Sequence, residues 1–201
     1  MKDLNNFILE KLKITKDTKI ISYNYYPKTN KGLKSLIRKL IKERGENADL
    51  NDIDTSKITD MHGIFMDSNF NGDISNWNVS NVKNMTGMFI HSIFNNDISK
   101  WDVNNVENMH MMFFKGIFNQ DISKWNVSNV IDCEGMFYEN PNFNQDLSKW
   151  NLANCKKANT MFYNSNYNQN LDNMKINKDC EMRAMFLSSP LEKNPPKWYK
   201  Q

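Results

Sequence analysis

The chain has 201 residues, of which 26 are Lys or Arg and 23 are Asp or Glu, giving a net charge of +3 at pH 7. This length fits one domain and is enough to bury a continuous core. The sequence lacks an apolar run long enough to span a membrane, and its three cysteines lack Cys-x-x-Cys spacing. These features argue against a membrane protein, a disulfide framework and a zinc site.

The first 48 residues do not repeat, and their hydrophobic pattern predicts a helix, a strand and a second helix. The first helix is expected over about 3–14, the strand over about 20–26 and the second helix over about 30–44, where Gly45 ends it. We interpret residues 1–48 as a capping segment, because the first unit of a repeat stack otherwise exposes its core.

Charge is unevenly distributed along the chain. Residues 1–45 hold 12 Lys or Arg and 4 Asp or Glu, whereas the remainder holds 14 and 19. Such asymmetry can mark an anionic contact, for which the second helix offers Lys31, Lys34, Arg38, Lys39 and Lys42. Exposed lysine faces are usually only solvated, and no nucleic-acid-binding motif is present. Nucleic-acid binding is therefore the less favoured alternative.

From residue 49 to 189 the chain repeats with a period of 24 or 25 residues. One column of the repeat is Phe65, Phe89, Phe113, Phe137, Phe162 and Phe186. A second column pairs an aromatic residue with an asparagine, at Asn71, Asn95, Asn119, Asn144 and Asn168. A third holds Trp77, Trp101, Trp125 and Trp150. Columns in register predict a solenoid of about six units.

The spacing within one unit predicts its local structure. Residues 74–79 are expected to form a short parallel strand, Ser80 to cap a helix, and residues 82–89 to form that helix. The predicted fold class is an α/β solenoid, a leucine-rich-repeat-like right-handed stack of short parallel strands and short helices with an N-terminal α/β cap. Residues 190–201 are rich in proline and should close the last coil.

Several columns have two possible roles. The asparagine column is expected to hydrogen-bond between coils. The column Asp73, Asp97, Asp121 and Asp146 should accept turn N–H groups, with a calcium ladder as the less favoured alternative. The tryptophan column is either a buried ladder or an exposed strip for stacking. Cys133, Cys155 and Cys180 are interpreted as small buried hydrophobic residues.

The motif Phe-Asn-x-Asp-Ile-Ser-x-Trp-x-Val-Ser-x-Val-x-x-Met-x-x-Met-Phe, at 94–113 and 118–137, resembles the BspA-like leucine-rich-repeat proteins. Most members of that family are described as bacterial surface proteins. The resemblance implies a repeat fold and a role in binding, and it supplies no catalytic residues. Ala158, Asn170 and Met174 depart from the motif.

The function predicted from these patterns is a non-enzymatic protein-interaction module with no cofactor and no metal. The sequence shows no catalytic constellation and no phosphate-binding loop. Partner contacts are expected on the strand face of the solenoid. The candidate residues there are Asn76, Asn78, Lys100, Asp102, Lys124, Asn126, Lys149, Asn151 and Lys175.

Alternatives remain open at this point. The module could be an inhibitor of a host enzyme encoded by a phage or mobile element, or a surface adhesin exported by a non-standard route. The first residues do not resemble a secretory signal, which favours the cytoplasm. The protein is expected to be a monomer or a weak homodimer that pairs through an open strand edge.

Overall fold

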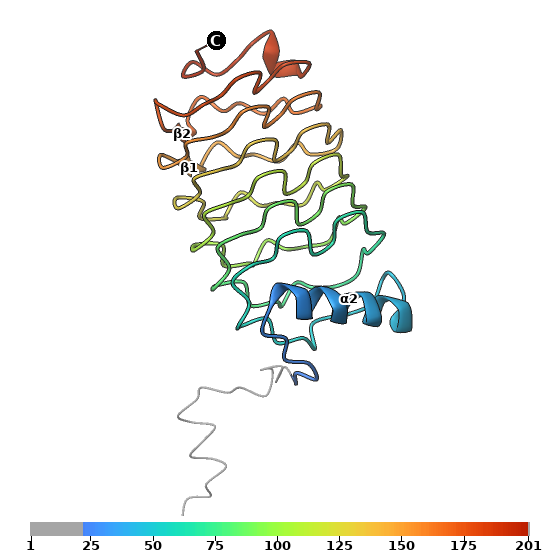
Figure 1. Cartoon of the computed structure of the whole chain (residues 1–201). Helices are drawn as coiled ribbons and strands as arrows, with labels where there is room; N and C mark the ends of the chain where they lie inside the picture. Colours follow the sequence, from blue (N-terminus) through green and yellow to red (C-terminus); the bar gives the residue numbers. More distant parts are fainter. Residues whose placement is uncertain (1–21, 201) are drawn as a thin grey trace, which may run out of the picture.

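The computed structural model describes residues 22–200 as a stack of coils, with one helix at the N-terminal end and a short tail at the other (Figure 1). The described elements are helix α2 (Asn30–Arg44), strands β1 (Asn151–Leu152) and β2 (Lys175–Ile176), and the 3-10 helix η1 (Pro190–Glu192). The helix expected over about 3–14 lies outside the described residues, as does the start of the strand expected over about 20–26.

Helix α2 lies across the first coil, and the sequence predicted its bounds correctly. The Thr29 hydroxyl accepts a hydrogen bond from the Gly32 amide at 3.1 Å, and Gly45 ends the helix with a φ of 90°. Leu33, Ile37 and Leu40 are buried on one face. This apolar stripe covers the core at the N-terminal end of the stack.

The C-terminal end of α2 is tied to the first coil by an ion pair. Arg44 donates two hydrogen bonds to the Asp52 carboxylate, each 3.0 Å long. These bonds, with a further bond from the Asn24 amide, hold the pKa of Asp52 below its usual value. Tyr25 also forms a parallel bridge with Ile53, so the segment before α2 pairs with the same coil.

A ladder of backbone hydrogen bonds along one stretch of each coil joins successive coils and runs in one direction. Backbone bonds elsewhere, such as Glu107 N–H to Lys83 O and Lys175 N–H to Trp150 O, run the other way. In the first coil the N–H groups of Met61, Gly63, Phe65 and Asp67 all donate to carbonyls of the following coil, at 2.8–3.0 Å. The same pattern recurs in each later coil up to residues 158–164, and the equivalent stretch of the last coil, residues 182–188, has no following coil. We call the donor stretches ladder segments: residues 61–67, 85–91, 109–115, 133–139, 158–164 and 182–188.

The ladder explains why the helix expected over 82–89 is absent. The N–H groups of Met85, Gly87 and Phe89 are used by the next coil, so they cannot form intrahelical bonds. Two successive turns form instead, closed by Met88 N–H to Met85 O and by Ile90 N–H to Gly87 O. The 3-residue steps of these turns place the same apolar side chains inward as a short helix would.

The strand expected over 74–79 is also mostly a turn. The Trp77 amide donates to the Ile74 carbonyl at 3.1 Å, which bends the backbone where an extended strand was predicted. In the described part of the chain, this column forms a named strand pair only at β1 and β2, where Asn151 pairs with Lys175 and Leu152 with Ile176. Ser80 therefore caps no helix, and its amide bonds to the Asn78 side chain.

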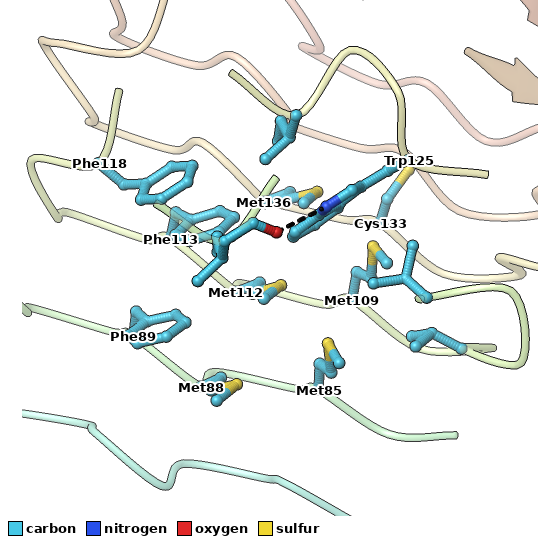
Figure 2. Packing of buried hydrophobic residues seen from close by; sticks show 14 of the residues in the cluster. Met85, Met88, Phe89, Met109, Met112, Phe113, Phe118, Trp125, Cys133 and Met136 are labelled. Carbon is cyan, nitrogen blue, oxygen red and sulfur yellow. Dashed lines mark hydrogen bonds between the residues drawn. The ribbon is translucent and has the colours of Figure 1, made fainter. Parts of the chain in front are cut away.

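Aromatic columns fill the core. Phe65 and Phe89 stack with ring centroids 5.5 Å apart and planes 2° apart, and the same column continues to Phe186. Figure 2 shows part of this packing, with methionines beside the phenylalanines. The tryptophan column is buried as well, at 1–4% exposure from Trp77 to Trp150. It is thus a core ladder and not an exposed stacking strip.

Each of these indole N–H groups donates to a carbonyl of the preceding coil. The Trp101 ring nitrogen lies 3.1 Å from the Ile74 oxygen. The Trp125 ring nitrogen lies 3.2 Å from the Ile98 oxygen, and Figure 2 marks this bond with a dashed line. Trp198 in the C-terminal tail makes the same bond to Leu171 at 2.7 Å. The tail therefore closes the stack by continuing the tryptophan column.

Two polar columns have the structural roles that their residue types predict. The Asn71 side-chain oxygen accepts the Asn95 amide at 2.8 Å, and this bond repeats from coil to coil as far as Asn168. Asp97 accepts the Ser99 amide at 2.8 Å, and this local bond is the main cause of its lowered pKa. Both columns fix turns at the corners of the coils.

Candidate interaction surfaces

The sequence-predicted partner residues lie on one side of the stack but differ in what their side chains do. Lys100, Lys124 and Lys149 are exposed and form a row of positive charge. Each lies near the aspartate three residues earlier and helps to lower that carboxyl pKa. Asn76 and Lys175 are exposed as well. The structure thus brings the lysine row together on the surface.

The neighbouring predicted column is occupied by turn formation. The side-chain oxygens of Asn78, Asp102, Asn126 and Asn151 each accept the amide of the residue two positions later, at 3.1–3.2 Å. Such bonds fix the backbone locally. These four residues therefore shape this face, and their acceptor atoms are already engaged.

The basic residues of α2 lie mainly opposite its buried stripe. Lys31, Arg38 and Lys42 are exposed, and Lys39 lies 3.8 Å from Glu43. Lys34 is half-buried beside Gly63, on the edge of the first ladder segment where its carbonyl oxygens face α2. A positive charge at this edge complements the partial negative charge of those oxygens. Lys34 therefore packs against the first coil, unlike the exposed basic residues of α2.

A column of apolar side chains on the outside of the coils was missed by the sequence analysis. It consists of the residue that follows each buried phenylalanine, and we call it the outer apolar column: Met66, Ile90, Phe114, Tyr138, Tyr163 and Leu187. Phe114 stacks on Tyr138 with centroids 4.7 Å apart, and Tyr138 on Tyr163 at 4.6 Å. The sequence signal that could have revealed this column is the apolar residue that follows the buried phenylalanine in each repeat.

The outer apolar column is surrounded by further apolar side chains and by charged side chains that form an ion pair. Ile93 and Ile117, near the same corner of the coils, are 43% and 39% exposed. Lys115 pairs with Glu139 at 3.3 Å and lies over the Phe114 ring. Partial desolvation and the neighbouring Glu139 raise the pKa of Tyr138. The result is a continuous apolar strip bordered by paired charges.

The three cysteines are free and buried. The sulfur atoms of Cys133 and Cys155 lie 3.5 Å apart in the core. Contact with Cys155 and complete burial raise the pKa of the Cys133 thiol, which favours its neutral form. Residues 22–200 hold no group of three or more His, Cys, Asp or Glu side chains arranged to bind a metal ion.

The stacked coils, with equivalent side chains of successive coils in register, define the chain as a repeat protein. Its surfaces carry the same kinds of side chain from one coil to the next. It belongs to a bacterial family described as "Mycoplasma protein of unknown function, DUF285", which matches residues 34–116 and again 114–198. No curated protein and no solved structure matches the chain. Among residues 22–200, no helix has both the length and the apolar character needed to cross a bilayer.

Proposed function

We propose that this protein is a non-enzymatic protein-interaction module that binds a macromolecular partner through the outside of its coils. The observation that carries the proposal is the outer apolar column, in which three aromatic rings stack along the surface. We also propose that the coils form a right-handed leucine-rich-repeat-like solenoid related to the BspA-like proteins. The stacked columns and the 24-residue hydrogen-bond register support that assignment.

Aromatic side chains on a rigid backbone favour protein recognition. Protein interfaces are enriched in tyrosine, phenylalanine and methionine, which bury large areas at a small entropic cost. Tyr138 is held by Phe114 and Tyr163 on either side, so binding would order few additional rotamers.

We further propose that the protein acts in the cytoplasm. The support is that Cys133, Cys155 and Cys180 are small buried side chains of the core, a use of cysteine that needs no disulfide. Free thiols persist in a reducing compartment, whereas an oxidising one favours disulfides.

Affinity capture with a matched pair of variants tests the proposal. Tyr138→Ser combined with Tyr163→Ser removes two rings from the outer apolar column, whereas Lys124→Ala alters an exposed residue of the lysine row. We expect proteins recovered from a lysate of the source organism by the wild type to be lost with the double variant and retained with Lys124→Ala. Equal recovery with the double variant and the wild type would reject the column as the binding surface.

A further inference from the structure

The last ladder segment, residues 182–188, has no following coil to receive its donors. Every earlier segment gives four N–H groups to the next coil, as Ala158, Thr160, Phe162 and Asn164 do to residues 181–187. The equivalent donors in the last segment are those of Met182, Ala184, Phe186 and Ser188. Because the ladder runs one way, this edge presents donors at alternate residues and all on one side.

One of these four donors already holds a carboxylate. The Ser188 amide donates to the Glu192 carboxylate at 2.8 Å, which caps the edge where η1 folds back. The N–H groups of Met182, Ala184 and Phe186 have no hydrogen-bond acceptor within residues 22–200. Tyr199 contacts this segment through its own hydroxyl, which donates to the Met182 carbonyl at 3.2 Å. The tail thus covers the aromatic core. Of the three unpaired donors, those of Met182 and Ala184 belong to partly exposed residues, whereas that of Phe186 lies at the buried base of the edge.

The open donors border a surface pocket of about 490 Å³. Its lining combines residues of the last ladder segment with apolar side chains, two cations and one carboxylate, that of Glu192, which already accepts the Ser188 amide. Leu187 and Tyr199 contribute apolar surface, while Arg183 and Lys200 contribute positive charge. The side chain of Arg183 is exposed. Such a pocket suits a ligand that supplies hydrogen-bond acceptors and negative charge.

The polarity of the ladder argues against a second copy of this chain as the occupant. Two C-terminal edges facing each other would set donors against donors. The complementary carbonyl edge at the other end is covered by α2, where the Asn30 side chain donates to Asp60 O at 3.3 Å and to His62 O at 3.1 Å. Within residues 22–200, the homodimer through an open edge that the sequence left possible therefore finds no matching surface at either end.

We propose that this edge binds an extended acidic segment of a partner protein. Its carbonyls at alternate residues would accept the N–H groups of Met182, Ala184 and Phe186, as the carbonyls of a following coil do inside the stack. A carboxylate of the segment would pair with Arg183 or Lys200. This site is separate from the outer apolar column, so either surface can fail its test without the other.

Fluorescence anisotropy with labelled peptides measures the binding. The probes are an eight-residue peptide of alternating Glu and Val and a matched peptide of alternating Lys and Val. We expect only the acidic peptide to bind, and Arg183→Ala to weaken it about tenfold. Lys57→Ala removes the same charge from an exposed position in the first coil, at the other end of the stack, and should change affinity less than about twofold.

Amide exchange by NMR locates the peptide on the wild-type protein. Saturating acidic peptide should slow exchange at Met182, Ala184 and Phe186. The proposal is overturned if neither peptide binds, if both bind equally, or if the acidic peptide binds without protecting these amides. It is also overturned if free glutamate protects the three amides as well as the peptide does, because that result defines a simple anion site.

Discussion

Replacing Trp125 tests whether the indole hydrogen bonds hold the coils together. Its ring N–H donates to the Ile98 carbonyl at 3.2 Å, and the side chain is only 4% exposed. In Trp125→Phe the ring remains apolar but is smaller and has no donor. Substitution by 3-benzothienylalanine keeps the indole shape and removes only the N–H group.

The size of the stability loss depends on whether the Ile98 carbonyl keeps another hydrogen bond in the variants. This carbonyl also accepts the Trp101 amide at 3.1 Å, so losing the indole bond does not leave the oxygen without a donor. The hydrogen bond then contributes about 1 kcal/mol rather than the larger cost of an unpaired buried group. The lost volume adds about 1 kcal/mol in Trp125→Phe. The Phe variant should lose about 2 kcal/mol, and the benzothienyl variant about 1 kcal/mol.

Urea unfolding followed by circular dichroism measures these losses, and thermal unfolding should show a fall of about 4–8 °C for Trp125→Phe. Met174→Leu is the matched control, because Met174 occupies the same column without a donor and such a swap costs less than about 1.5 kcal/mol. If the benzothienyl variant is as stable as the wild type, the indole bonds do not stabilise the stack.

Two further substitutions probe the coil that departs from the repeat and the attachment of α2. Tyr167 replaces phenylalanine in its column, and its buried hydroxyl has only the Leu147 backbone nearby and no well-formed hydrogen bond among residues 22–200. Tyr167→Phe should therefore stabilise the protein by about 1 kcal/mol in urea unfolding, and a loss of stability would show that the hydroxyl is satisfied. Asp52→Asn should cost about 1–2 kcal/mol at pH 7, because it removes the charged partner of Arg44. The pKa of Asp52 is lowered by folding, so this contribution is complete above about pH 4 and disappears as the pH falls through the folded-state pKa. Unfolding curves of wild type and Asp52→Asn should therefore converge at low pH, and a constant difference would contradict the assignment.

The sequence predicted the register of the columns better than the backbone conformation between them. Buried tryptophans, the asparagine contacts and α2 all follow from residue type and spacing. Residues 82–89 were expected to be helical because Val82, Met85 and Phe89 share a helical face. Consecutive turns place the same residues inward, so hydrophobic spacing alone cannot separate the two structures.

The candidate surfaces were harder to predict because they depend on which polar atoms are left free by the fold to contact a partner. Asn78 and Asp102 are surface residues as expected, but their side-chain oxygens are used in turns. Phe114 and Tyr138 resemble core residues in composition, yet they lie outside the coils. The open donors at Ala184 and Phe186 follow from ladder direction, which no side-chain pattern encodes.

Hydrogen–deuterium exchange of the phenylalanine amides most directly tests the one-way ladder on which this account rests. The amides of Phe89, Phe113, Phe137 and Phe162 donate to the next coil and should exchange slowly. The Phe186 amide occupies the same column without an acceptor among residues 22–200 and should exchange at least about a hundredfold faster. Equal protection of Phe186 and Phe113, or rapid exchange at Phe113 and Phe137, would contradict the ladder and its open C-terminal edge.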